Sequence, residues 1–161
     1  MKNLIFICFL AISNCLFGQG GPEVTINVEG SLIWDKVFSG IDLTEAGNDY
    51  VGTYLSDINA TYIKIAAANQ TIDYKVVIHR EDSADWDTRL DLQIKRISIS
   101  VNGSTGGLTF TSIPANFDKD FYYTKGKNNT DKIQFQIKGI SVLLPAKVYT
   151  TTVVFTVMNR Y

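Results

Sequence analysis

The densest group of charged side chains lies between residues 81 and 91, where acidic residues surround Trp86. Calcium binds about six to eight oxygen ligands, and several carboxylates in one loop can supply them. The candidate ligands are Asp82, Asp85 and Asp87. Their spacing does not match an EF-hand loop, which also needs a turn glycine, so a solvated acidic loop stays open as the alternative.

Few side chains in this sequence are suited to catalysis. His79 is the one histidine, and it lies on the face of its expected strand opposite Tyr74, Val76 and Ile78. A lone strand histidine is typical of a surface or interface position, and the sequence assembles no Ser-His-Asp or Cys-His group around it. We therefore predict a protein that is not an enzyme and has no cofactor.

Three aromatic residues, Trp86, Tyr122 and Tyr123, fall in segments expected to be loops. An exposed aromatic ring can stack on the apolar face of a sugar while neighbouring polar groups bind its hydroxyls. These residues suggest a carbohydrate-binding module as the alternative function. Trp86 has a second interpretation, as a lid that folds back on the edge of the domain.

The first residues have the pattern of an export signal. Lys2 is followed by an apolar run over residues 4–12, then by Gly18 and Gln19. A membrane-spanning helix needs about 20 apolar residues, and this run has about half that number. We predict a signal peptide at residues 1–19, one domain at residues 20–161 and no transmembrane segment after signal removal. The protein would be periplasmic, at the cell surface or extracellular.

Both cysteines, Cys8 and Cys15, lie inside the predicted signal. Lipidation of Cys15 is an alternative, although Asn14 before it suits that processing poorly. The remaining chain would have no disulfide, so its core alone must stabilise it.

The net charge after signal removal is slightly negative. Removal of the signal takes away Lys2, one of the 15 basic residues, while all 16 acidic residues remain. No basic stripe exists to bind phosphates, so nucleic acid is excluded as a partner.

Period-two alternation of apolar residues runs through the rest of the chain, and Gly or Asn turns separate the runs. We expect an all-β fold, a single antiparallel β-sandwich of seven to nine strands, immunoglobulin-like or pilin-like. Two hairpins are expected, one joining residues 61–66 to 71–80 and the other joining 133–144 to 149–158. Parity changes predict a bulge at Gly139, and a bulge or a crossing between sheets near Lys95 and Arg96. The expected strands cover residues 24–28, 31–38, 50–55, 61–66, 71–80, 90–101, 108–113, 133–144 and 149–158. On the last of these strands the odd residues should face the core, and the even face, which is mostly Thr, should be largely solvated.

Two resemblances to known proteins follow from short motifs. The run from Leu144 through Pro145 and Tyr149 into an alternating Thr/Val strand resembles the closing motif of pilin-like sandwiches, the spore-coat-U and chaperone–usher group. Lys147 departs from that motif, which usually has glycine there. The resemblance implies self-assembly by exchange of a donor strand. The export signal and the β pattern suggest other surface proteins as partners, and the loop aromatic residues suggest glycans.

The second resemblance concerns modification. Residues 82–84, Asp-Ser-Ala, resemble the O-glycosylation motif of secreted Bacteroidetes proteins, which would place a glycan on Ser83. The end of the signal also resembles export signals of those bacteria.

Assembly by strand exchange needs a free extension of the chain. The extension expected here is residues 20–23, which is too short to act as a donor strand unless residues 24–28 are themselves released. We favour the alternative, in which residues 24–28 pair within their own domain and the domain is self-complete. The function we expect is that of an exported structural or adhesive protein.

Overall fold

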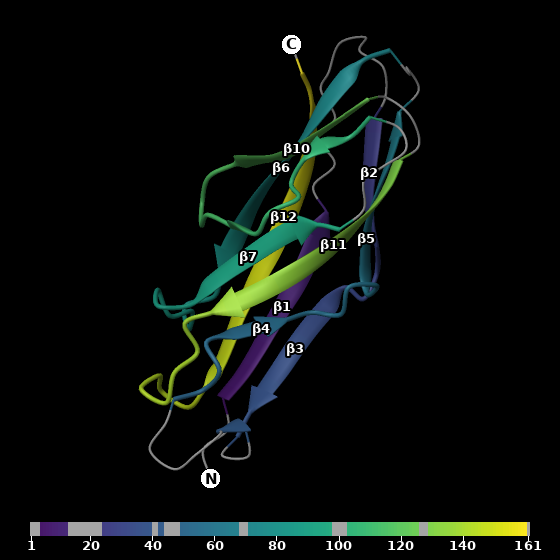
Figure 1. The fold of residues 1–161 in the computed structure, drawn as a ribbon. Helices are drawn as coiled ribbons and strands as arrows, with labels where there is room; N and C mark the ends of the chain where they lie inside the picture. Colours follow the sequence, from purple (N-terminus) through teal and green to yellow (C-terminus); the bar gives the residue numbers. More distant parts are fainter. Residues whose placement is uncertain are drawn as a thin grey trace.

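The computed structural model describes residues 4–12, 24–39, 42–43, 49–67, 71–97, 103–125 and 129–160. All elements in these ranges are strands, arranged in two sheets that pack into a sandwich (Figure 1). The expected all-β sandwich is therefore confirmed. Among the same residues, no helix is long and apolar enough to cross a lipid bilayer.

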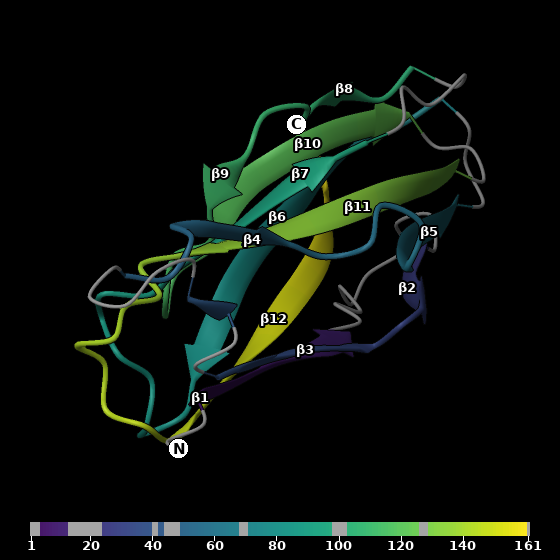
Figure 2. The ribbon, with the colours of Figure 1, turned by 60° about the horizontal axis from the view of Figure 1, so that its bottom comes forward.

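The first sheet, sheet A, contains the C-terminal strand in its interior. Its order is β3 (Ile33–Phe38), β1 (Leu4–Ile12), β12 (Val148–Asn159), β6 (Asp73–Asp82), β10 (Lys119–Lys125) and β8 (Thr105–Gly106). In Figures 1 and 2, β1 and β3 run side by side along one edge of this sheet. The run predicted to be a signal is thus an interior strand of sheet A.

The second sheet, sheet B, has β11 at its centre. Its order is β2 (Val24–Gly30), β5 (Thr61–Ala67), β11 (Asn129–Lys138), β7 (Asp91–Arg96) and β9 (Thr111–Ser112), and β4 (Thr53–Leu55) also pairs with β11. Twelve strands are described, more than the seven to nine expected. The three additional strands are β1, which was predicted to be a signal, β10, which was predicted to be a loop, and β8, whose two residues are too few to show a period-two pattern.

Pairing is antiparallel throughout the described strands with one exception. β1 runs parallel to β12, from the pair Ile5 and Val148 to the pair Ile12 and Phe155. Parallel neighbours need a long crossover connection, and nearly the whole domain separates these two strands in the sequence. The sandwich is therefore antiparallel as expected, apart from this one strand pair.

The faces of β12 follow the alternation of its sequence. Its odd residues are buried in the core, with Tyr149, Val153 and Phe155 at 0% exposure, as expected. The even face was predicted to be largely solvated, and this is wrong at Val154 and Thr156, which are also buried. β12 is an interior strand, so neighbouring strands shield its outer face as well.

Both predicted hairpins are wrong. β5 lies in sheet B and β6 in sheet A, and β11 and β12 are divided between the sheets in the same way. Each connection crosses from one sheet to the other. Turn residues mark where a strand ends, but they do not distinguish an in-plane turn from a crossing.

The two parity changes also mark strand ends. Gly139 has φ of +82° just after β11, and a Cβ there would collide with the carbonyl of Arg89. It ends the strand and forms no bulge within it. β7 keeps a regular register with β11 up to Arg96. The chain then crosses to sheet A, through residues of which 98–102 lie outside the described ranges.

Candidate functional site

The acidic loop between β6 and β7 distributes its carboxylates among separate cations. Asp82 lies 3.2 Å from Arg80, Asp85 lies 3.0 Å from Lys147, and Asp87 lies 2.7 Å from Arg89. Hydrogen bonds from Arg89 hold the pKa of Asp87 below its usual range. Within the described ranges, no three acidic, His or Cys side chains converge as metal ligands would. The geometry therefore gives the calcium hypothesis no support.

Trp86 folds back on the sandwich. Its ring is half-buried against the core and lies 4.8 Å from the guanidinium carbon of Arg80. This matches the lid interpretation, and part of the ring is not accessible to a sugar. Ser83 is half-buried and its hydroxyl is shielded from solvent, so glycosylation of Ser83 stays a prediction.

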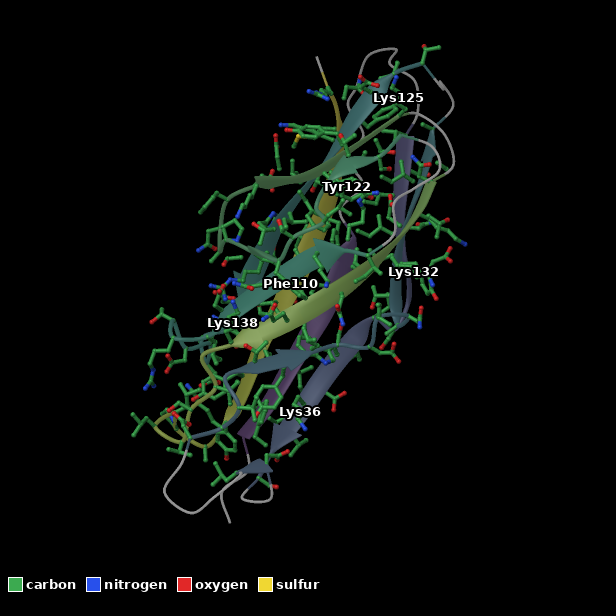
Figure 3. All side chains as sticks on the ribbon, in the orientation of Figure 1. Lys36, Phe110, Tyr122, Lys125, Lys132 and Lys138 are labelled. Carbon is green, nitrogen blue, oxygen red and sulfur yellow. The ribbon has the colours of Figure 1, made fainter. Side chains whose placement is uncertain are left out.

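Tyr122 and Tyr123 lie on β10, not in a loop as expected. Tyr122 is fully buried (Figure 3) and its pKa is raised well above its usual value, first by burial and next by the charge of Asp131. Tyr123 is half-buried, donates a hydrogen bond to Asp120 at 2.9 Å and has Arg160 at 4.3 Å from its ring centre. The strand alternation sends these two neighbours to opposite faces, so they form no common platform.

A buried ion pair that the sequence analysis missed joins β7 to β11. Arg96 is 1% exposed and Asp131 0%, and the Arg96 Nη1 atom lies 3.0 Å from Asp131 Oδ1. Arg96 also donates to the backbone carbonyls of Ser104 and Gly106, at 3.2 and 3.0 Å, and lies over the ring of Tyr122. Burial raises the pKa of Asp131, and Arg96 opposes that shift. This group fastens the segment around β8 to the core and faces no solvent.

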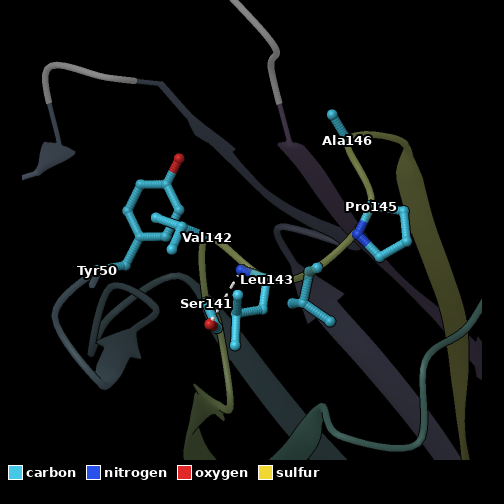
Figure 4. Close-up of a pocket in the computed structure, with 7 residues that line it drawn as sticks. Tyr50, Ser141, Val142, Leu143, Pro145 and Ala146 are labelled. Carbon is cyan, nitrogen blue, oxygen red and sulfur yellow. Dashed lines mark hydrogen bonds between the residues drawn. The ribbon is translucent and has the colours of Figure 1, made fainter. Parts of the chain in front are cut away.

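A hollow in the described surface lies beside the connection from β11 to β12 (Figure 4). Its volume is about 240 Å³. Most of the lining residues are of apolar type, although polar atoms form the larger share of the lining surface, and Leu143 and Val142 are 78% and 49% exposed. The lining residues are Tyr50, Ser141, Val142, Leu143, Leu144, Pro145 and Ala146.

Asp49 holds this loop in a defined shape. Its carboxylate accepts hydrogen bonds from the Ser141 hydroxyl at 2.7 Å and from the Val142 N–H at 2.8 Å. These bonds lower the pKa of Asp49. The Ser141 hydroxyl in turn accepts from the Leu143 N–H at 3.1 Å, and the Tyr149 hydroxyl donates to the Pro145 carbonyl at 2.8 Å. The loop therefore presents its apolar side chains from an ordered backbone.

A second hollow, of about 350 Å³ and with charged residues in its lining, lies at the outer face of β6. Phe117 is 64% exposed at its rim, and Asn116 next to it has φ of +65°. The imidazole of His79 lies 2.8 Å from Asp118 through Nδ1 and 3.8 Å from Glu81 through Nε2. The sequence analysis treated His79 as a surface residue and did not single out Phe117, because an isolated Phe in a loop has no pattern that marks it.

No family model matches the chain, and no curated protein matches it either. The resemblance to pilin-like domains therefore stays a prediction.

Proposed function

We propose that the protein is exported and serves as a non-catalytic structural or adhesive β-sandwich subunit at the cell surface or outside the cell. The observation that carries this proposal is the loop from Ser141 to Ala146, which exposes apolar side chains from a hydrogen-bonded backbone. Contiguous exposed apolar side chains on a soluble domain are typical of protein interaction sites.

The order of this loop favours binding. A partner that covers Val142 and Leu143 gains apolar burial without first having to order the backbone, since Asp49 has already fixed it. Such preorganisation reduces the entropy lost on association. The partner class that fits is an apolar protein surface, either on a second copy or on another surface protein.

Two further observations support the proposal. The leader-like composition of residues 1–19 supports export. The second nitrogen of His79 faces the carboxylate of Glu81, where a catalytic histidine would need a nucleophile or a substrate proton. The described side chains near His79 thus favour a binding surface over a hydrolytic site.

Size-exclusion chromatography with light scattering, run at several concentrations, tests self-association, and a binding assay on intact cells tests adhesion. Leu143→Ser should weaken whichever interaction is found by at least about tenfold, because the most exposed apolar side chain of the loop is lost. Leu108→Ser is the matched control, since Leu108 is an exposed leucine at 48% on another loop. A protein that stays monomeric and binds no cell surface would refute the proposal.

A carbohydrate-binding module is the second candidate, favoured by the hollow around Phe117. An exposed ring beside the His79, Glu81, Asn116 and Asp118 side chains offers a stacking face together with hydrogen-bonding groups. A glycan array should then show binding that Phe117→Ala removes and Trp86→Ala leaves unchanged. An array without binding would eliminate this candidate.

A further inference from the structure

Sheet A is continuous only because β1 fills a slot between β3 and β12. β1 pairs with β12 over eight residues and with β3 over six. Its Cys8 side chain is 1% exposed and belongs to the core. Yet β1 consists of the residues that carry the export signal pattern, so export would remove an interior strand from the finished sheet.

Removal of β1 has unequal consequences for its two neighbours. β12 would keep its antiparallel pairing with β6, which spans nine residues. β3 would lose all strand pairing, because β1 is the one strand that pairs with it in the ranges that the structure describes. Unpaired backbone groups on both sides of the slot favour its closure.

The directions of the strands allow β3 itself to close the slot. β3 is antiparallel to β1, and β1 is parallel to β12, so β3 already runs antiparallel to β12. The registers also agree. Ile7 pairs with both Asp35 and Thr150, and Cys8 pairs with both Trp34 and Thr151. A sideways shift by one strand spacing would place these partners opposite each other with their faces unchanged.

We propose that removal of residues 1–19 lets β3 move into the place of β1 and pair antiparallel with β12, which leaves a self-complete domain. This inference rests on the proposed export and processing of the chain. The ring contacts of Phe38 with Tyr50 and Tyr54 oppose this shift. Without the shift, however, β3 would have no strand partner among the described residues after β1 is removed.

A strand of the same chain has an advantage over a strand from a second copy. The Ser31 N–H, just before β3, donates to the Ala60 carbonyl at 2.7 Å and keeps the segment beside the sandwich. A tethered segment has an effective concentration on the order of millimolar, which a second copy does not reach in dilute solution. Intramolecular closure should therefore win over strand exchange between chains.

Paired cysteines test this directly. The test variant has the substitutions Asp35→Cys and Thr150→Cys, which provide the two thiols. Cys8→Ala and Cys15→Ala remove the natural thiols, and a recognition sequence for a site-specific protease is inserted after Gln19. In the uncut chain, β1 separates the two positions by two strand spacings, about 9 to 10 Å. A disulfide needs Cα atoms within about 7 Å, so it should form only after cleavage and only within one chain.

The control pair is Glu81→Cys with Thr152→Cys. These residues are direct partners across β6 and β12, so they should form a disulfide both before and after cleavage. Hydrogen exchange of β12 amides in the cleaved chain without cysteine substitutions gives a second measurement. Protection of β12 should persist after the leader peptide has left.

Three outcomes would overturn the inference. Disulfides that link two chains would assign the slot to a second copy, and loss of protection in β12 would show an open slot. A leader peptide that stays bound after cleavage would show that β1 remains the resident strand. The mass of the protein secreted by a bacterial host tests processing separately, so that failure of the proposed export is distinguished from failure of strand closure.

Discussion

An ion pair lies near each end of β7, and one pair is buried while the other is exposed. At its C-terminal end, Arg96 and Asp131 form an ion pair with both side chains removed from water. Before its N-terminal end, Asp85 pairs with Lys147 at the same distance of 3.0 Å, but these side chains are 67% and 38% exposed. Burial therefore decides how strongly the loss of an ion pair affects stability. Water screens the exposed pair of Asp85 and Lys147. Arg96 and Asp131 are shielded from water, so each depends on the other to compensate its charge.

The buried pair should give the largest loss. Asp131→Ala leaves the guanidinium of Arg96 buried without its counter-charge, and we expect the free energy of unfolding to fall by about 3 to 5 kcal/mol. Urea unfolding followed by circular dichroism measures this. Asp131→Asn, which keeps the shape and loses the charge, is the control. A loss below about 1 kcal/mol for the alanine variant would show that water reaches Arg96.

An apolar side chain of the core gives a reference for that loss. Phe155→Ala on β12 should lower the free energy of unfolding by about 3 to 5 kcal/mol, because the ring is fully buried and its removal leaves a cavity. The same urea experiment applies. A change of a few tenths of a kcal/mol would contradict the assignment of the odd face of β12 to the core.

Replacing both members of the buried pair sharpens the comparison. Arg96→Met with Asp131→Leu removes the unpaired charge, so the double variant should be more stable than Asp131→Ala. It should remain about 1 to 3 kcal/mol less stable than the natural protein, since the Ser104 and Gly106 carbonyls lose their donor. A double variant as unstable as the single one would argue that these carbonyl contacts dominate.

The exposed pair should matter little. Asp85→Ala is expected to change the free energy of unfolding by at most about 1 kcal/mol, and by less as salt is added. Lys147→Ala should have the same small effect. An effect comparable to that of Asp131→Ala would break the contrast between the two ends of β7.

The smallest effect concerns pKa shifts. They should have opposite signs for Asp131, which is buried beside the C-terminal end of β7, and for Asp87, which lies in the loop before β7. The carboxyl carbon resonance of Asp131 should titrate above the ordinary Asp pKa and that of Asp87 below it, by burial and by Arg89 respectively. The raised pKa contributes stability that is present at acidic pH and is lost as pH rises through the folded value. The lowered pKa contributes stability that is present above the unfolded value and is lost as pH falls. NMR titration that showed both groups shifted in the same direction would contradict this assignment.

Sequence patterns predicted this structure correctly where they are local and failed where the interacting residues are distant in the sequence. The alternation in β6 correctly placed Tyr74, Val76 and Ile78 in the core. The buried pair was missed because Asp131 continues the odd apolar face of Ile133 and Phe135 with a charged residue, and Arg96 breaks its own strand in the same way. A charge at an apolar position was the available signal, and it would have indicated a buried partner.

The candidate sites show the same division. Acidic residues near one another in the sequence suggested a metal site, yet each pairs with a cation of its own. Asp82 and Asp87 pair with Arg80 and Arg89, each two residues away, and Asp85 pairs with the distant Lys147. The ordered loop at Leu143 and the hollow at Phe117 depend on Asp49 and His79, which lie far away in the sequence. Sequence spacing alone does not bring such residues together.

Side-chain alternation along a strand is set within a few residues, so the sequence alone predicts the class of fold and the inward face of most strands. The tertiary structure decided which strands are neighbours, including the parallel entry of β1 beside β12. Strand pairing joins backbone groups that look alike in every strand, so the choice of neighbour depends on how the whole chain closes its core.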